Sequence, residues 1–140
     1  MAHTNRSLNL EVLEKSYWTR PEEWYSFLEE ACHAYRKIPL EQLTIEHLRL
    51  LIGQKMSLDY LLPIAFEKLK ANIFAEGDCY EGDLLDNVLS LDTDYWQSQP
   101  HYYQRFLSIL KKKKSYIEKY NRDNKHRQLI KQIESLLEEN

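Results

Sequence analysis

The stretch LDYLLPIAFEKLKANI, residues 58–73, decides the fold. Its apolar residues cover almost every side of a helix, and a helix that is apolar nearly all round is buried. The stretch therefore predicts the buried central helix of an α-helical domain. Pro63 lies inside it, and because proline removes one backbone hydrogen bond of a helix, we expect a kink or a late helix start there. The residues that define this helix are Leu58, Leu61, Leu62, Ala65, Phe66 and Leu69.

The composition of the 140-residue chain also favours helices. It holds three glycines, four prolines and only two valines, whereas residues that lose little side-chain freedom in a helix are abundant. A chain of this length is most simply one domain, and it needs no disulfide or metal to hold a core. The expected fold is all-α: residues 1–140 form a single-domain bundle of about six or seven helices.

Two helices are predicted before residue 40. The first covers residues 7–18, with Val12 facing inward. The second starts at the TRPEEW sequence, where Thr19 can cap and Pro21 suits the first turn, and it ends before Pro39. One face of this second helix is expected to be apolar and buried: Trp24, Phe27, Leu28, Ala31 and Tyr35.

The remaining helices follow from cap signals and apolar spacing. Thr44 is placed to cap a helix that ends at Gly53, and Ser57 to cap the central helix. The last two helices are expected to form a C-terminal helical hairpin. Later helices are predicted at residues 82–90, 101–120 and 129–137, joined by a connector at 91–100 and by an NRDN interruption at 121–124.

The net charge of −3 hides an uneven distribution. Residues 1–100 carry a net charge of −8, and residues 101–140 carry +5. The N-terminal sequence lacks the apolar run of a secretory signal, and no stretch is apolar enough to span a membrane. We therefore expect a cytoplasmic protein in which Cys32 and Cys79 are reduced and serve packing.

Acidic residues crowd the stretch FAEGDCYEGDLLDNVL, residues 74–89, and no Lys or Arg occurs between Lys70 and Arg105. A calcium loop that started at Asp78 would have Tyr80, Gly82 and Leu89 at positions that need oxygen ligands, so a metal site is disfavoured. Enzyme chemistry is disfavoured because the chain has no nucleophile motif and no phosphate-binding loop. The acids could also serve only as helix caps and solvated groups, with the glycines supplying positive φ.

Repulsion within this acidic window costs stability, and a basic partner would offset that cost. We therefore expect a surface that binds a basic protein, with aromatic side chains that slow dissociation. The candidate contact residues are Glu76, Asp78, Tyr80, Glu81, Asp83, Asp86, Asp92, Asp94, Tyr95 and Trp96.

A second charge feature supports an alternative function. Four consecutive lysines, residues 111–114, lie among further basic residues and tyrosines, a composition that could bind nucleic acid. Four consecutive residues of a helix point in four directions, however, so they make a poor basic stripe. The alternative is a nucleic-acid-binding module that uses the C-terminal basic hairpin, and a solvated face is the simpler interpretation.

Residues 43–96 resemble the central block of a family of immunity proteins from bacterial contact-dependent growth inhibition (CDI) systems. The resemblance rests on LRLLIGQ (48–54), LDYLLPIA (58–65), EGDCYEGDLLDNVL (76–89) and the pair Tyr95–Trp96, in this order and spacing. It implies a small cytosolic protein without catalytic activity or cofactor, which binds and blocks the C-terminal toxin domain of its cognate effector. Such toxins are often nucleases with basic active sites.

The same motifs also have a structural interpretation, in which LRLLIGQ is a core helix with its stop and the two Gly-Asp turns hold neighbouring helices together. The expected toxin contact is the Glu76–Asp94 face, with the first two helices and the C-terminal hairpin as alternatives.

Overall fold

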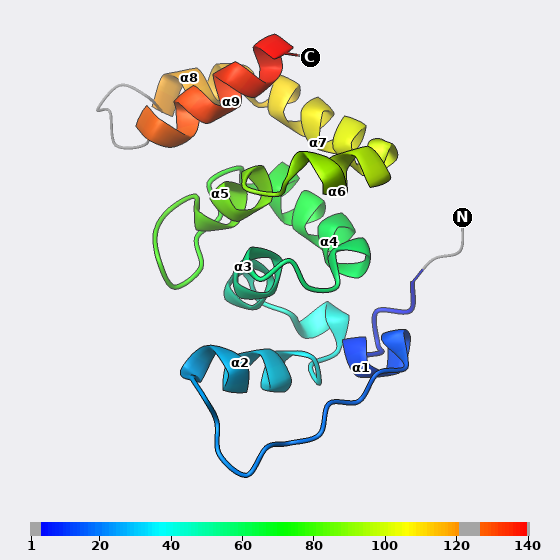
Figure 1. Cartoon of the computed structure of the whole chain (residues 1–140). Coiled ribbons are helices and arrows are strands. Elements are labelled where there is room, and N and C mark those ends of the chain that lie inside the picture. Colours follow the sequence, from blue (N-terminus) through cyan, green and yellow to red (C-terminus); the bar gives the residue numbers. More distant parts are fainter. Residues whose placement is uncertain (1–3, 121–126, 140) are drawn as a thin grey trace.

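A computed structural model of the chain describes residues 4–120 and 127–139. These residues form nine α-helices and one short 3-10 helix, and they contain no strand (Figure 1). The all-α prediction is confirmed. The elements are α1 (Leu10–Glu14), α2 (Phe27–Tyr35), η1 (Leu40–Gln42), α3 (Ile45–Gly53), α4 (Leu58–Ala71), α5 (Asp83–Leu89), α6 (Thr93–Ser98), α7 (Pro100–Lys112), α8 (Lys114–Tyr120) and α9 (Arg127–Glu139).

The helices stack in tiers from α2 at one end to α8 and α9 at the other, with α3, α4 and α5 in the middle (Figure 1). Helix α3 packs on α2, α4 and α5, while α7 packs on α4 and α9. Half of the α4 residues are buried, among them Leu61, Leu62 and Phe66, which are fully inaccessible. The prediction that this helix forms the centre of the core is therefore confirmed.

Helix α4 starts at Leu58 and continues through Pro63, so the expected late start is wrong. Proline has no N–H to donate to the carbonyl four residues earlier, which is that of Asp59. The hydroxyl of Tyr102 on α7 donates to this Asp59 carbonyl at 3.0 Å. A tertiary contact thus satisfies the backbone group that the proline leaves without its helical donor.

The predicted N-terminal helices are both shorter than expected. Helix α1 spans only Leu10–Glu14, and α2 begins at Phe27 instead of near Pro21. The ring of Trp24 lies 4.7 Å from that of His33, whereas nine residues of one helix would separate them by about 13.5 Å along its axis. The Ser26 hydroxyl caps α2 by accepting from the Glu29 N–H, so the segment before it is free to fold back.

The C-terminal half contains more helices than predicted because two expected segments are divided. The expected connector at 91–100 contains α6, which Asp92 caps by accepting from the N–H of Tyr95. The expected long helix at 101–120 ends at Lys112 and resumes at Lys114. Helices α8 and α9 lie side by side as the predicted hairpin, and the NRDN sequence falls outside the described residues.

Thr19 was also expected to cap but lies before the start of α2, and of the other two predicted caps one has the expected bonds. Thr44 caps α3, with its hydroxyl accepting from the N–H of His47 and the His47 ring accepting from the N–H of Thr44. Ser57 occupies the cap position of α4 but has a positive φ of 53°, and its hydroxyl donates to Glu14 instead of capping. The reason is a tertiary contact: Glu14 accepts hydrogen bonds from both Ser57 and Arg36, and this group of polar side chains fixes the chain at the end of α1.

Candidate functional site

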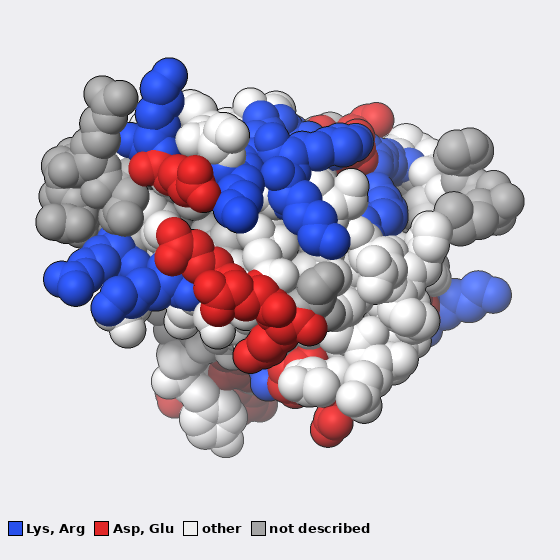
Figure 2. All heavy atoms as spheres, turned by 90° about the horizontal axis from the view of Figure 1, so that it is seen from above, with Lys and Arg blue, Asp and Glu red and all other residues white. Residues whose placement is uncertain are grey.

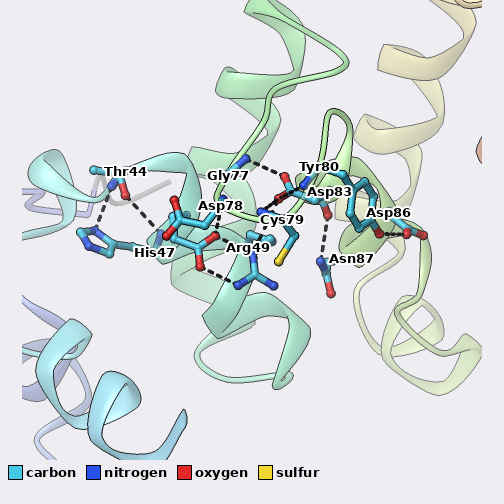
Figure 3. Close-up of polar contacts among 11 residues, drawn as sticks. Thr44, His47, Arg49, Gly77, Asp78, Cys79, Tyr80, Asp83, Asp86 and Asn87 are labelled. Carbon is cyan, nitrogen blue, oxygen red and sulfur yellow. Dashed lines mark hydrogen bonds and ion pairs between the residues drawn. The ribbon is translucent and has the colours of Figure 1, made fainter. Parts of the chain in front are cut away.

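The acidic loop, residues 72–82 between α4 and α5, is organised around the carboxylate of Asp83 (Figure 3). The N–H of Gly77 donates to its Oδ1 at 2.7 Å. The N–H groups of Cys79 and Tyr80 donate to its Oδ2 at 3.0 and 3.2 Å. Asp83 is fully buried. One buried side chain therefore fixes the path of most of the loop.

A second attachment comes from α3. The guanidinium of Arg49 donates two hydrogen bonds of 2.6 Å to the carboxylate of Glu46, and its Nε lies 3.8 Å from Oδ2 of Asp83. Glu46 in turn accepts from the N–H of Asp78 at 2.9 Å. The hydrogen bond from Arg49, aided by that from Asp78, lowers the pKa of Glu46 despite its burial. The loop is thus attached to α5 through Asp83 and to α3 through Glu46, in both cases by hydrogen bonds to a carboxylate.

The two glycines of the loop have different roles. Gly82 has a φ of +88° and precedes α5, which confirms the expected positive φ. Gly77 is not in that conformation. A Cβ at Gly77 would lie 2.7 Å from Oε1 of Glu46 and 3.2 Å from its Cα. Gly77 is therefore required for the close approach of the loop to α3, and the positive φ expected there is wrong.

The outer side of the loop carries the acids that remain at the surface. Glu76 and Asp78 are exposed, and Glu81 and Asp86 are half-buried. The hydroxyl of Tyr80, which is half exposed, donates to the carboxylate of Asp86. This hydrogen bond raises the pKa of Tyr80 to about 12, so the ring stays neutral and fixed over the start of α5.

The other four candidate residues lie at α6. Asp92 and Asp94 are exposed, and Asp92 also pairs with Lys55 at 3.3 Å. The hydroxyl of half-buried Tyr95 donates to Asp59 at 2.9 Å, and burial followed by this bond raises the pKa of Tyr95. Trp96 is only 8% exposed and stacks on the ring of Phe106, with centroids 5.5 Å apart.

Two of the ten candidate residues are therefore placed differently from the prediction. Asp83 was expected near the solvent face of its helix, which is wrong: three backbone donors turn its carboxylate inward. Trp96 was a candidate surface anchor and is part of the core. The sequence pattern did not reveal Glu46 and Arg49, because residues 71–104 contain no Lys or Arg and the compensating cation comes from α3. Glu46 and Arg49 lie three residues apart on one predicted helix, and this spacing, which allows an ion pair, was the signal that the sequence offered.

The remaining candidates lie in two groups, one on the acidic loop and α5 and one on α6. Within the described part of the chain, no three His, Cys, Asp or Glu side chains are grouped so that they could hold a metal ion. None of the helices in residues 4–120 and 127–139 is long and apolar enough to cross a membrane. Carboxylates at a protein surface contribute negative potential there.

Comparison with known families identifies the chain. The family model of CDI immunity proteins matches residues 12–106, which include the end of α1, all of α2 to α6 and the first half of α7. The chain belongs to the CDI immunity proteins. The resemblance seen in the sequence is confirmed, and the acidic loop lies inside the matched residues, whereas α8 and α9 lie outside them. No curated protein and no solved structure matches the chain.

Proposed function

We propose that this immunity protein acts in the cytoplasm by binding and blocking the C-terminal toxin domain of its cognate CDI effector. It needs no catalytic step and no cofactor. The family match over residues 12–106 is the observation that carries the proposal. The toxin domain is proposed to be a nuclease, because a nuclease surrounds its active site with positive charge and so complements an acidic protein.

The proposed contact surface comprises the exposed and half-buried candidates of the acidic loop and α6. Residues 1–100 carry a net charge of −8, so long-range attraction accelerates the encounter with a basic toxin. The hydrogen bonds to Asp83 and Glu46 hold the loop before binding, so little conformational entropy is lost on association. The contact residues proposed are Glu76, Asp78, Tyr80, Glu81, Asp86, Asp92, Asp94 and Tyr95. Asp83 and Trp96 support them from inside.

The function is tested by co-expression. If an exoprotein gene lies directly upstream of the gene for this chain, the C-terminal part of that exoprotein supplies the toxin domain for the test. Cells that express this toxin domain should survive only when this protein is present. Cell death despite soluble immunity protein would refute the proposed function.

The surface is tested by charge reversal at Glu76 and Asp94, which are both exposed. Surface plasmon resonance of the double Lys variant against the toxin domain should show an association rate about tenfold lower at low salt, with a weaker salt dependence. The matched control reverses Glu118 and Glu138 on α8 and α9, outside the family match, with the same change in net charge. Equal association rates for the two variants would remove the acidic surface from the proposal while leaving toxin binding in place.

The alternative of a nucleic-acid-binding hairpin receives less support. From the side of the C-terminal helices, a band of acidic side chains separates groups of basic side chains (Figure 2). Lys114 lines a hollow together with Glu118, Glu134 and Glu138. This interleaving divides the positive potential that a phosphate backbone needs. In a gel-shift titration with RNA and DNA, tight salt-sensitive binding that is lost when residues 111–114 become Gln would favour the alternative.

A further inference from the structure

A second surface follows from the segment that departs most from the predicted helices. Among the described residues, eight large hydrophobic side chains are exposed, and six of them lie between Val12 and Leu28. The most exposed are Tyr17, Tyr25 and Phe27, with exposed fractions of 66%, 94% and 78%. Most of the exposed large apolar side chains thus come from one segment that runs from α1 to the start of α2, and such a concentration indicates an interaction site. The six residues, here called the aromatic platform, are Val12, Tyr17, Trp18, Tyr25, Phe27 and Leu28.

The polar groups beneath the platform hold its N-terminal part in place. Arg36 is almost fully buried. Its guanidinium donates to Glu14 at 2.5 Å and to the carbonyl of Ser16 at 2.9 Å, and it lies 4.4 Å from the ring of Trp18. Because Arg36 sits at the C-terminal end of α2, these contacts fix the chain that leaves α1 against α2. The chain between α1 and α2 therefore has a defined shape although it contains no helix or strand.

The C-terminal part of the platform is held by rings and a cap. The ring of His33 on α2 lies between Trp18 and Trp24, at centroid distances of 4.9 and 4.7 Å. The carboxylate of Glu29 accepts from the N–H of Tyr25 at 2.9 Å. Tyr25 and Phe27 therefore project from a backbone that is fixed on both sides. Aromatic side chains have few rotatable bonds, so they lose little entropy on binding, and they are enriched among residues that dominate binding energy.

The charge around the platform indicates what binds there. Residues 12–35 contain five glutamates and two basic residues, Lys15 and Arg20; the glutamates are Glu14, Glu22, Glu23, Glu29 and Glu30. A partner that covers the platform must therefore combine apolar surface with positive charge. A second copy of this chain is a poor occupant, since two platforms facing each other would bring the glutamates of both copies together. The platform also lies within the residues that match the family.

We infer that the aromatic platform is the apolar anchor of the toxin interface, with Tyr25 and Phe27 as its main contacts. This inference rests on the proposed function and assigns the two surfaces different roles. The acidic surface raises the association rate, and the platform lowers the dissociation rate. Removing an aromatic anchor from the centre of an interface weakens binding by about thirtyfold or more, mainly through faster dissociation.

The test compares the toxin affinity of a Tyr25→Ala/Phe27→Ala variant with that of wild-type protein. We expect an equilibrium dissociation constant about thirtyfold or more higher, an unchanged salt dependence of the association rate, and faster dissociation. Tyr116→Ala is the control, because Tyr116 is 45% exposed but lies on α8 outside the family match. Since Tyr25 and Phe27 are exposed, the urea unfolding midpoint of the double variant should equal that of wild type.

The outcomes separate the inference from the proposed function. Wild-type protein that fails to bind the toxin domain refutes the proposed function. Wild-type protein that binds, together with a double variant that binds equally well, refutes the platform and leaves the function standing. Analytical ultracentrifugation covers the remaining case: a wild-type dimer that becomes monomeric in the double variant would show that the platform binds a second copy, which overturns the inference.

Discussion

The Asp83→Asn variant tests whether one buried carboxylate organises the acidic loop. Asparagine keeps the shape of the side chain but replaces one acceptor oxygen with an NH2 donor. If the amide oxygen faces Gly77, the new donor points at the N–H groups of Cys79 and Tyr80, which then lose their acceptor. A hydrogen bond to a charged group contributes about 1.5–3 kcal/mol, and two are lost in part, so we expect the free energy of unfolding to fall by about 3–4 kcal/mol.

Urea unfolding followed by far-UV circular dichroism at pH 7 measures this loss, and an unchanged m-value would show that the compactness of the two states is unaltered. Asp94→Asn is the matched control. Asp94 lies exposed in the first turn of α6, where a carboxylate contributes about 0.3–1 kcal/mol through the helix dipole. Faster hydrogen exchange at the amides of Cys79 and Tyr80 should accompany the loss. A difference below about 1 kcal/mol between Asp83→Asn and wild type would refute the reasoning.

Three other variants probe the same loop. Gly77→Ala should cost about 1–3 kcal/mol in urea unfolding, because its Cβ would lie 3.2 Å from the backbone of Glu46; a neutral effect would contradict the close approach. Gly82→Ala should cost about 1–2 kcal/mol through its φ of +88°, and a stabilising effect would be inconsistent with that conformation. Because Arg49 lowers the pKa of Glu46 below 4.5, the stability that Glu46 contributes is present above pH 4.5 and is lost as the pH falls through the folded pKa. The stability difference between wild type and Glu46→Gln should therefore be largest at pH 7 and shrink toward pH 3, and a difference that grows on acidification would rule this out.

Local signals were sufficient for the middle of the chain. Helices α3, α4 and α5 occur close to their predicted bounds because apolar spacing and caps agree there: Thr44 caps α3, and Gly82 precedes α5. Agreement between local preference and tertiary packing is what makes a segment predictable. Pro63 shows the limit, since its effect on α4 depended on a donor from α7 that no local pattern reveals.

Elsewhere, side chains distant in the sequence decide the structure. The apolar spacing of Trp24, Phe27 and Leu28 is helical, yet α2 starts only at Phe27, and Phe27 points to solvent. The cause is a pair of contacts with Trp18: its ring packs against the ring of His33 and against the guanidinium of Arg36, so the chain before α2 lies along α2. For the candidate site, sequence patterns located the acidic residues, but which of them reach the surface depended on bonds across the loop.

Both candidate surfaces depend on a buried charge. Asp83, with a side chain 1% exposed, holds the acidic loop, and Arg36, with a side chain 4% exposed, holds the start of the aromatic platform. Burying a charged pair contributes little net stability, because desolvation offsets the attraction. The attraction between the charges is therefore not the main reason for these residues. Charged groups instead offer several directed hydrogen bonds to backbone, which is what a segment without helix or strand requires in order to keep one shape. We therefore explain Asp83 and Arg36 by positioning. Each holds a proposed recognition surface in one shape before the partner binds, so binding does not have to order that surface.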